Sequence, residues 1–161
     1  MLRGGILHNE LNKVLASMGH GDILIVCDAG FPIPRDAWRV ELAITRDFPD
    51  LVPVLEIIAS EFIAEKVMFA HEVPANNAPL YRNLQRIFAD CELESIAHQT
   101  MLTEMAHKAK AIVRTGGYNP WGNIALVSGT DPFAWFTNEE VVVPPFYQNR
   151  IAQIKRARGE A

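Results

Sequence analysis

Two titratable side chains flank one apolar run in the segment MGHGDILIVCDAGFPIP, residues 18–34. His20 stands between two glycines before ILIVC, and Asp28 follows that run directly. An imidazole is well suited to exchange protons near neutral pH, and the glycines leave room for a small ligand. A carboxylate at the end of a strand can bind hydroxyl groups or orient an imidazole. The alternatives are a polar residue in a helix C-terminal turn for His20 and a turn-forming residue for Asp28.

A second segment with suitable chemistry is GGYNPWGN, residues 116–123. Trp121 offers a flat apolar face that suits a sugar ring, and Asn123 offers donors and acceptors for hydroxyls. Gly122 lies between them. The alternative is a tight connection that contains one partly buried tryptophan.

Several common motifs are absent from the sequence. Gly19-His20-Gly21 lacks the third glycine of a dinucleotide-binding loop, and it precedes a strand instead of following one. There is no P-loop, and His71-Glu72 lacks the second histidine of a zinc helix. The five histidines show no ligand spacing, so we predict no metal.

Composition points to a soluble protein of the cytoplasm. The formal charge is −4, and the one basic cluster (Lys155, Arg156 and Arg158) is interpreted as a solvated helix end, so no nucleic-acid partner is expected. Cys27 and Cys91 form no metal-spaced pair, which favours a reducing compartment. The N-terminus lacks the apolar region of a signal peptide, and no stretch approaches the roughly 20 apolar residues of a membrane span.

Strand-like and helix-like segments alternate along the chain, which predicts an α/β fold. We expect one three-layer domain over residues 1–161, with a mostly parallel or mixed sheet covered by helices. Asn9 and Asp50 are the expected caps of the first two helices. The predicted helices are 9–18, 50–60, 77–90 and 99–110, and the predicted strands are 23–27, 40–44, 62–70, 93–97, 111–114 and 123–127.

The C-terminal extension, from about residue 130 to 161, is rich in aromatic and aliphatic residues. We expect it to pack on its own domain or on a neighbouring subunit, because a monomer would have difficulty covering so much apolar surface. This favours a homo-oligomer.

Together, MGHGDILIVCDAGFPIP and AIVRTGGYNPWGNIAL resemble the D-ribose pyranase and L-fucose mutarotase family over roughly residues 1–129. The resemblance implies a cytoplasmic α/β protein that forms rings, commonly decamers, and interconverts the ring and anomeric forms of free monosaccharides without a cofactor. It implies that His20 is the general acid. Asp28 and the segment Trp121, Gly122 and Asn123 would bind the sugar.

Three positions depart from the family pattern. Trp121 replaces the usual tyrosine, and Gly117 replaces a common glutamate. The family carries a sugar-binding His (ribose type) or Arg (fucose type) on the helix before the distal strand. Counting back from Arg114 without a gap gives Gln99 at this position, whereas His98 fits with a one-residue shift. These departures leave the choice of sugar open.

Two functions therefore remain from the sequence. One is a cofactor-independent isomerase, and the alternative is a non-catalytic monosaccharide-binding module of the same fold. A straight strand would place His20 and Asp28 about 25 Å apart. They can share a site if the chain folds back, if His20 leans over the sheet, or if a neighbouring subunit supplies one of them.

Overall fold

The computed structural model describes residues 4–160 of the chain. The elements, in chain order, are α1 (Asn9–Ser17), β1 (Ile23–Cys27), β2 (Arg39–Glu41), α2 (Leu51–Glu61), β3 (Ala64–Ala70), α3 (Val73–Asn76), α4 (Ala78–Ile87), β4 (Glu92–Ile96), α5 (His98–Thr100), the π-helical segment η1 (Met101–Met105), α6 (Ala106–Lys108), β5 (Ala111–Arg114), β6 (Asn123–Ser128), α7 (Pro132–Trp135) and α8 (Pro145–Arg158).

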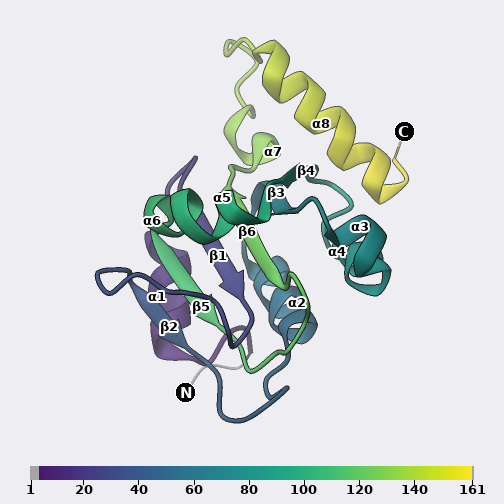
Figure 1. Cartoon of the computed structure of the whole chain (residues 1–161). Helices are drawn as coiled ribbons and strands as arrows, with labels where there is room; N and C mark the ends of the chain where they lie inside the picture. Colours follow the sequence, from purple (N-terminus) through teal and green to yellow (C-terminus); the bar gives the residue numbers. More distant parts are fainter. Residues whose placement is uncertain (1–3, 161) are drawn as a thin grey trace.

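The six strands form one sheet in the order β2-β5-β1-β6-β3-β4 (Figure 1). The strands β2, β5 and β1 run parallel to one another, as do β3 and β4. The strand β6 joins these two groups and runs antiparallel to both of its neighbours. This confirms the predicted α/β fold, with a mixed sheet.

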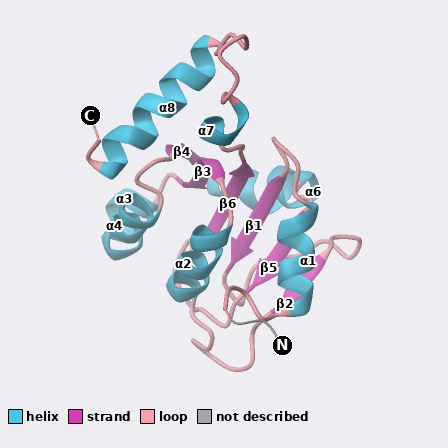
Figure 2. Ribbon diagram, turned by 180° about the vertical axis from the view of Figure 1, so that it is seen from behind, coloured by secondary structure: helices cyan, strands magenta, loops and turns pink. Residues whose placement is uncertain are grey.

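Helices cover both faces of the sheet, which gives three layers (Figure 2). On one face, α1, α2 and α4 bury residues such as Leu11, Leu55 and Leu84 in the larger apolar core. On the other face, the continuous helix formed by α5, η1 and α6 buries Met101 and Met105 in a smaller core. The central strand β1 is consequently buried on both faces, as its apolar run predicts.

Two local expectations were wrong. The N-cap of α1 is His8, not Asn9, because the His8 side chain accepts the Leu11 N–H. The strand β2 ends at Glu41 and does not reach Ile44, because the chain beyond Leu42 turns back on itself. The expected cap Asp50 is confirmed, since its carboxylate accepts the Leu51 N–H at 2.7 Å.

Strand directions define two opposite ends of the sheet, where the strands begin or stop, and we call these ends, not the outer strands, its edges. Cys27 at the end of β1 pairs with Asn123 at the start of β6 and with Arg114 at the end of β5. We call this end the Asp28 edge, because Asp28 follows Cys27 there. The opposite end, where β1 begins and β6 ends, is the His20 edge.

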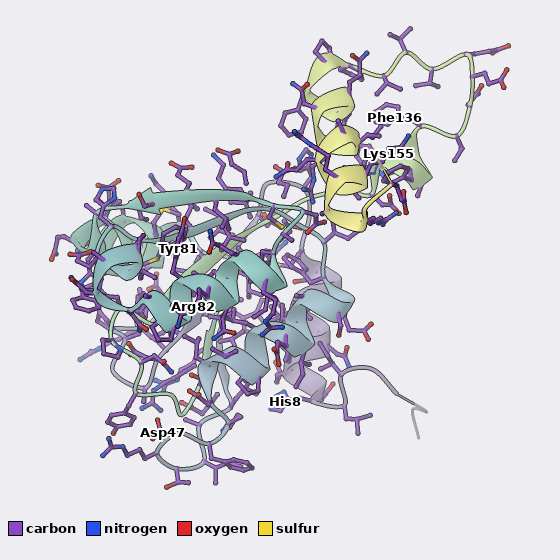
Figure 3. All side chains as sticks on the ribbon, turned by 90° about the vertical axis from the view of Figure 1, so that its right-hand side faces the viewer. His8, Asp47, Tyr81, Arg82, Phe136 and Lys155 are labelled. Atoms are coloured by element: carbon purple, nitrogen blue, oxygen red, sulfur yellow. The ribbon has the colours of Figure 1, made fainter. Side chains whose placement is uncertain are left out.

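The C-terminal extension packs on its own chain. The helices α7 and α8 stand at the His20 edge, above β3 and β4 in Figure 1. The side chains of Arg150 and Ile154 on α8 are 5% and 6% exposed. Figure 3 shows Phe136 and Lys155 of the extension at one end of the molecule and Asp47 at the other. Within residues 4–160, no helix combines the length and the apolar character that crossing a membrane requires.

Candidate functional site

Asp28 lies in a loop that is tightly held against the end of β5. Its Oδ1 atom accepts the Gly30 N–H at 2.7 Å, and its own N–H donates to Asn123 Oδ1 at 3.3 Å. The Ala29 N–H donates to Gly117 O at 2.9 Å, and the Arg114 guanidinium donates to Ala29 O. Asp28 is therefore placed by contacts from both segments that the sequence singled out.

Burial raises the pKa of the Asp28 carboxyl above its ordinary value. Hydrogen bonds from Gly30, Phe31 and Asn123 and the charge of His98 act in the opposite direction without cancelling this effect. A carboxylate that is partly desolvated and already oriented is suited to hold a hydroxyl group.

Trp121, Gly122 and Asn123 reach the same edge because β6 starts there. Asn123 is 4% exposed and contacts Asp28 directly. Trp121 has a left-handed backbone, with φ of 56°, and its half-buried ring packs against the larger core. Gly122 is buried, and a Cβ atom there would lie 2.7 Å from Asn119 O. The turn therefore requires glycine at this position.

A surface depression of about 320 Å³ opens beside Asp28. Its remaining lining comes from Ala29, Gly30, Gly117, Tyr118, Asn119 and Pro120. Tyr118 was missed by the sequence reasoning, although it lies in the segment that was singled out. Its ring is 61% exposed and contacts the Arg46 guanidinium, 4.8 Å from the ring centroid. The depression thus carries a phenol as well as the carboxylate.

The helix before β5 includes the π-helical segment η1, in which hydrogen-bonded groups are spaced by five residues instead of four. The sequence pattern, counted back from Arg114 without a gap, gave Gln99 as the helix-borne position and His98 after a shift of one residue. The side chain of Gln99 is exposed, whereas His98 is half-buried and close enough to Asp28 to lower its pKa.

His20 lies at the other edge and contacts a different set of groups. Its Nε2 atom is 2.9 Å from Glu65 Oε2. The loop that carries it is fixed by the Gly21 N–H, which donates to Ser128 O at 2.8 Å. Gly21 has φ of 83°, a conformation that favours glycine. Glu65 gave no signal in the sequence, because it reaches His20 through the pairing of β3 with β6.

The structure therefore places Asn123 against Asp28 and His98 near enough for its charge to act on that carboxyl. Trp121 lies in the same turn but packs on the larger core, and His20 lies apart. Neither loop folds back along the sheet: the His20 loop is bonded to the end of β6, and the Asp28 loop to the residues after β5.

Metal-binding potential is low in the region that the structure describes. Residues 4–160 contain no group of three His, Cys, Asp or Glu side chains that could hold a metal ion. Cys27 and Cys91 are buried free thiols. Burial raises the pKa of both, that of Cys91 to about 12, so neither is a ready thiolate ligand.

Comparisons with known proteins agree with the motifs and the fold. Residues 1–131 match the model of the RbsD / FucU transport protein family. D-ribose pyranase 2 of Rubrobacter xylanophilus is 54% identical over 95% of this chain and 99% of its own length. D-ribose pyranase 1 of Streptomyces griseus is 47% identical over 94% of this chain and 100% of its own length.

A solved structure shows how far the similarity of fold extends. RbsD from Bacillus subtilis, described in complex with D-ribose, superposes with a TM-score of 0.77 at 32% identity. The match covers 81% of this chain and 99% of that protein. The C-terminal extension thus lies beyond the Bacillus protein, whereas the two longer relatives extend into it.

Proposed function

Because this chain belongs to the RbsD / FucU transport protein family, we propose that it is an isomerase that interconverts the pyranose and furanose, or anomeric, forms of a free monosaccharide. D-ribose is the first choice of substrate, since both relatives that span nearly the whole chain are named for it. The observation that carries the proposal is the group at the Asp28 edge. There the Asp28 carboxylate and the Tyr118 ring line a depression of about 320 Å³. The Asn123 amide contacts Asp28, and the charge of His98 acts on the Asp28 carboxylate.

The reaction needs two proton transfers and the cleavage of one C–O bond. A proton is delivered to the ring oxygen while another leaves the anomeric hydroxyl, and the C1–O bond breaks to give the open-chain aldehyde. Attack of a different hydroxyl, or of the same hydroxyl on the other face of the carbonyl, reverses these transfers. His20 as general acid can deliver and recover the proton, and no step transfers electrons to a cofactor.

The proposed sugar site combines two subunits. Asp28, Trp121, Gly122 and Asn123 of one subunit bind the sugar, and His20 comes from the next. A head-to-tail contact of this kind generates a ring when its rotation closes. We therefore propose a homo-oligomeric ring of ten subunits in the cytoplasm. The two free, buried cysteines are compatible with a reducing compartment.

His98 takes the helix-borne sugar-binding position in this proposal, instead of Gln99. A π turn such as η1 can absorb one inserted residue, which is the one-residue shift that His98 requires, and the charge of His98 acts on Asp28. A histidine at this position is the pattern of the ribose type, which agrees with D-ribose as substrate.

Saturation-transfer NMR tests the proposal directly. The exchange rates between the ring forms of D-ribose and L-fucose are measured with wild type and with His20→Ala. We expect faster exchange of D-ribose with wild type and a loss of about 100-fold or more in the variant. Saturable ribose binding with buffer rates of exchange would instead identify the non-catalytic sugar-binding module.

A further inference from the structure

The imidazole of His20, whose side chain is 39% exposed, contacts side chains that the family pattern does not account for. Glu65 contacts Nε2 at 2.9 Å, and the rings of Trp135 and Tyr147 lie with their centroids 6.5 and 6.4 Å from that of His20. We infer that Glu65, Trp135 and Tyr147 are positioning residues that hold the His20 imidazole with Nδ1 facing the sugar. This inference rests on the proposed function, since it assigns a role to the surroundings of its general acid.

The backbone around Glu65 is built to deliver its carboxylate to His20. The pairing of β3 with β6 changes register between Ala64 and Lys66, and this irregularity redirects the side chain between them. Gly129, just after β6, permits the close approach, because a Cβ atom there would lie 2.9 Å from Glu65 Cβ. The Glu65 side chain is 18% exposed, which reduces the competition of water for its contact with His20.

The two aromatic rings come from the C-terminal extension, beyond the residues that match the family. Trp135 ends α7 and Tyr147 lies in the first turn of α8. Their ring centroids are 6.1 Å apart, and Phe136 packs on Tyr147 with its ring centroid at 5.0 Å. The rings therefore form one cluster, and His20 lies against it.

A buried arginine anchors this cluster to the His20 edge. Arg150, three residues after Tyr147, is 5% exposed, and its Nη2 atom donates to Ala64 O at 2.8 Å. The same nitrogen contacts Asp90 Oδ2 at 3.4 Å. Because Ala64 directly precedes Glu65, α8 and the carboxylate partner of His20 are fixed to the same point of β3.

This arrangement has a chemical consequence for the general acid. Glu65 engages Nε2, so the neutral imidazole carries its proton there and Nδ1 keeps a lone pair. Nδ1 is then the atom left to face the sugar, so it delivers the proton to the ring oxygen and recovers it when the ring closes again. The Trp135 ring lies at 88° to the imidazole and the Tyr147 ring at 47°, so both rings border the imidazole on the side of the C-terminal extension.

The test compares four changes by two readouts. The variants are Glu65→Ala, Glu65→Gln, the double variant Trp135→Ala/Tyr147→Ala and its conservative counterpart Trp135→Phe/Tyr147→Phe. Val142→Ala is the control, since Val142 is an 85% exposed residue of the same extension. The readouts are ribose exchange kinetics over a pH series and the imidazole nitrogen NMR signals of His20.

We expect wild type and Val142→Ala to show the Nε2–H tautomer and the same pH profile. Glu65→Ala and the double alanine variant should show a mixture of tautomers, an altered pH profile and a kcat about tenfold lower, with KM changed less than twofold. Glu65→Gln and the double phenylalanine variant should recover most of the tautomer preference. An amide oxygen can accept the Nε2–H, and a phenyl ring keeps the aromatic contact with the imidazole.

Each remaining outcome has a defined meaning. Wild-type tautomer and pH profile in Glu65→Ala and in both aromatic variants would overturn the inference. If the double alanine variant fails to fold, the comparison of Glu65→Ala with Glu65→Gln still decides, because only the first is expected to lose the tautomer preference. If wild type does not accelerate exchange, the proposed function fails, whereas the tautomer measurement continues to support or refute the positioning of His20.

Discussion

His20 and Asp28 lie at opposite ends of one buried strand, β1 (Ile23–Cys27). Five strand residues rise roughly 16 Å, and the loops at both ends are hydrogen-bonded to their own edge of the sheet. This separation is the reason for proposing that His20 and Asp28 reach one monosaccharide from two different copies of the chain.

Mixed assemblies test this shared site. His20→Ala and Asp28→Ala should each be inactive alone, because each removes one half of every site. Rings assembled from equal amounts of both should regain roughly a quarter of wild-type activity, since a quarter of the interfaces join two intact halves. The measurement is ribose exchange by NMR after co-expression of the two variants.

The control is a mixture of His20→Ala with the His20→Ala/Asp28→Ala double variant. It contains no intact His20 and should stay inactive in any arrangement. If the first mixture also stays inactive while its rings assemble normally, each site lies within one chain and the arrangement proposed above is wrong.

A second prediction concerns which of His98 and Gln99 binds the sugar. His98→Ala should weaken ribose binding about tenfold or more, because it removes a hydrogen-bonding group beside Asp28. Gln99→Ala should change it less than twofold, because that side chain is exposed. Isothermal titration with D-ribose measures both, and the reverse order of effects would assign the position to Gln99.

The sequence predicted those parts of the site that depend on residues close together in the chain. The apolar run ILIVC predicted β1 with its exact bounds, and Asp28 at its end follows from that. The segment from Gly116 to Asn123 was identified as a polar loop with a stacking ring. Its contact with Asp28 depends on the antiparallel pairing of β6 with β1, which no local pattern specifies.

The contacts of His20 could not be predicted from the sequence, because they depend on how strands and helices far apart in the chain are aligned. Glu65 reaches His20 through a shift in the pairing of β3 with β6, and periodicity carries no signal for such an irregularity. The choice between His98 and Gln99 depends on the local path of this helix, which includes the π-helical segment η1. The apolar composition of the extension predicted that it packs, but not that its rings surround His20.

The raised pKa of Asp28 predicts that the carboxylate that binds the sugar lowers the stability of the folded protein. Burial favours the protonated carboxyl, so the folded state binds a proton more tightly than the unfolded state. Stability is therefore lost as pH rises from the ordinary value of 3.8 through the raised folded-state pKa, and the full loss is reached above that pKa. Asp28→Asn removes this cost but also removes the carboxylate that holds the sugar.

Asp28→Asn should accordingly melt at a higher temperature than wild type at pH 7 while its ribose binding is abolished. The difference in Tm should shrink as pH falls through the pKa of Asp28, because wild type then carries a neutral carboxyl as well. Thermal melts over a pH series measure it. A variant that is less stable than wild type at pH 7 would show that the hydrogen bonds of the carboxylate outweigh its desolvation.

Gly122→Ala tests whether the turn before β6 needs a residue without a Cβ atom. A Cβ atom at this buried position would lie 2.7 Å from Asn119 O and 3.1 Å from Leu51 Cδ2, and the backbone oxygen cannot move without breaking the turn. Gly122→Ala should therefore cost about 1–3 kcal/mol of unfolding free energy, roughly 3–10 °C in Tm for a chain of this size. It should also weaken ribose binding, because the displaced turn carries Trp121 and Asn123.

Gly4→Ala is the matched control for this change. Gly4 is exposed and has no atom within 4 Å of an added Cβ, so its Tm and ribose affinity should match wild type. Thermal melts and ribose titrations of both variants separate two roles of the turn. A stable Gly122→Ala variant with intact affinity would show that the turn can relax, and that the positions of Trp121 and Asn123 do not depend on this glycine.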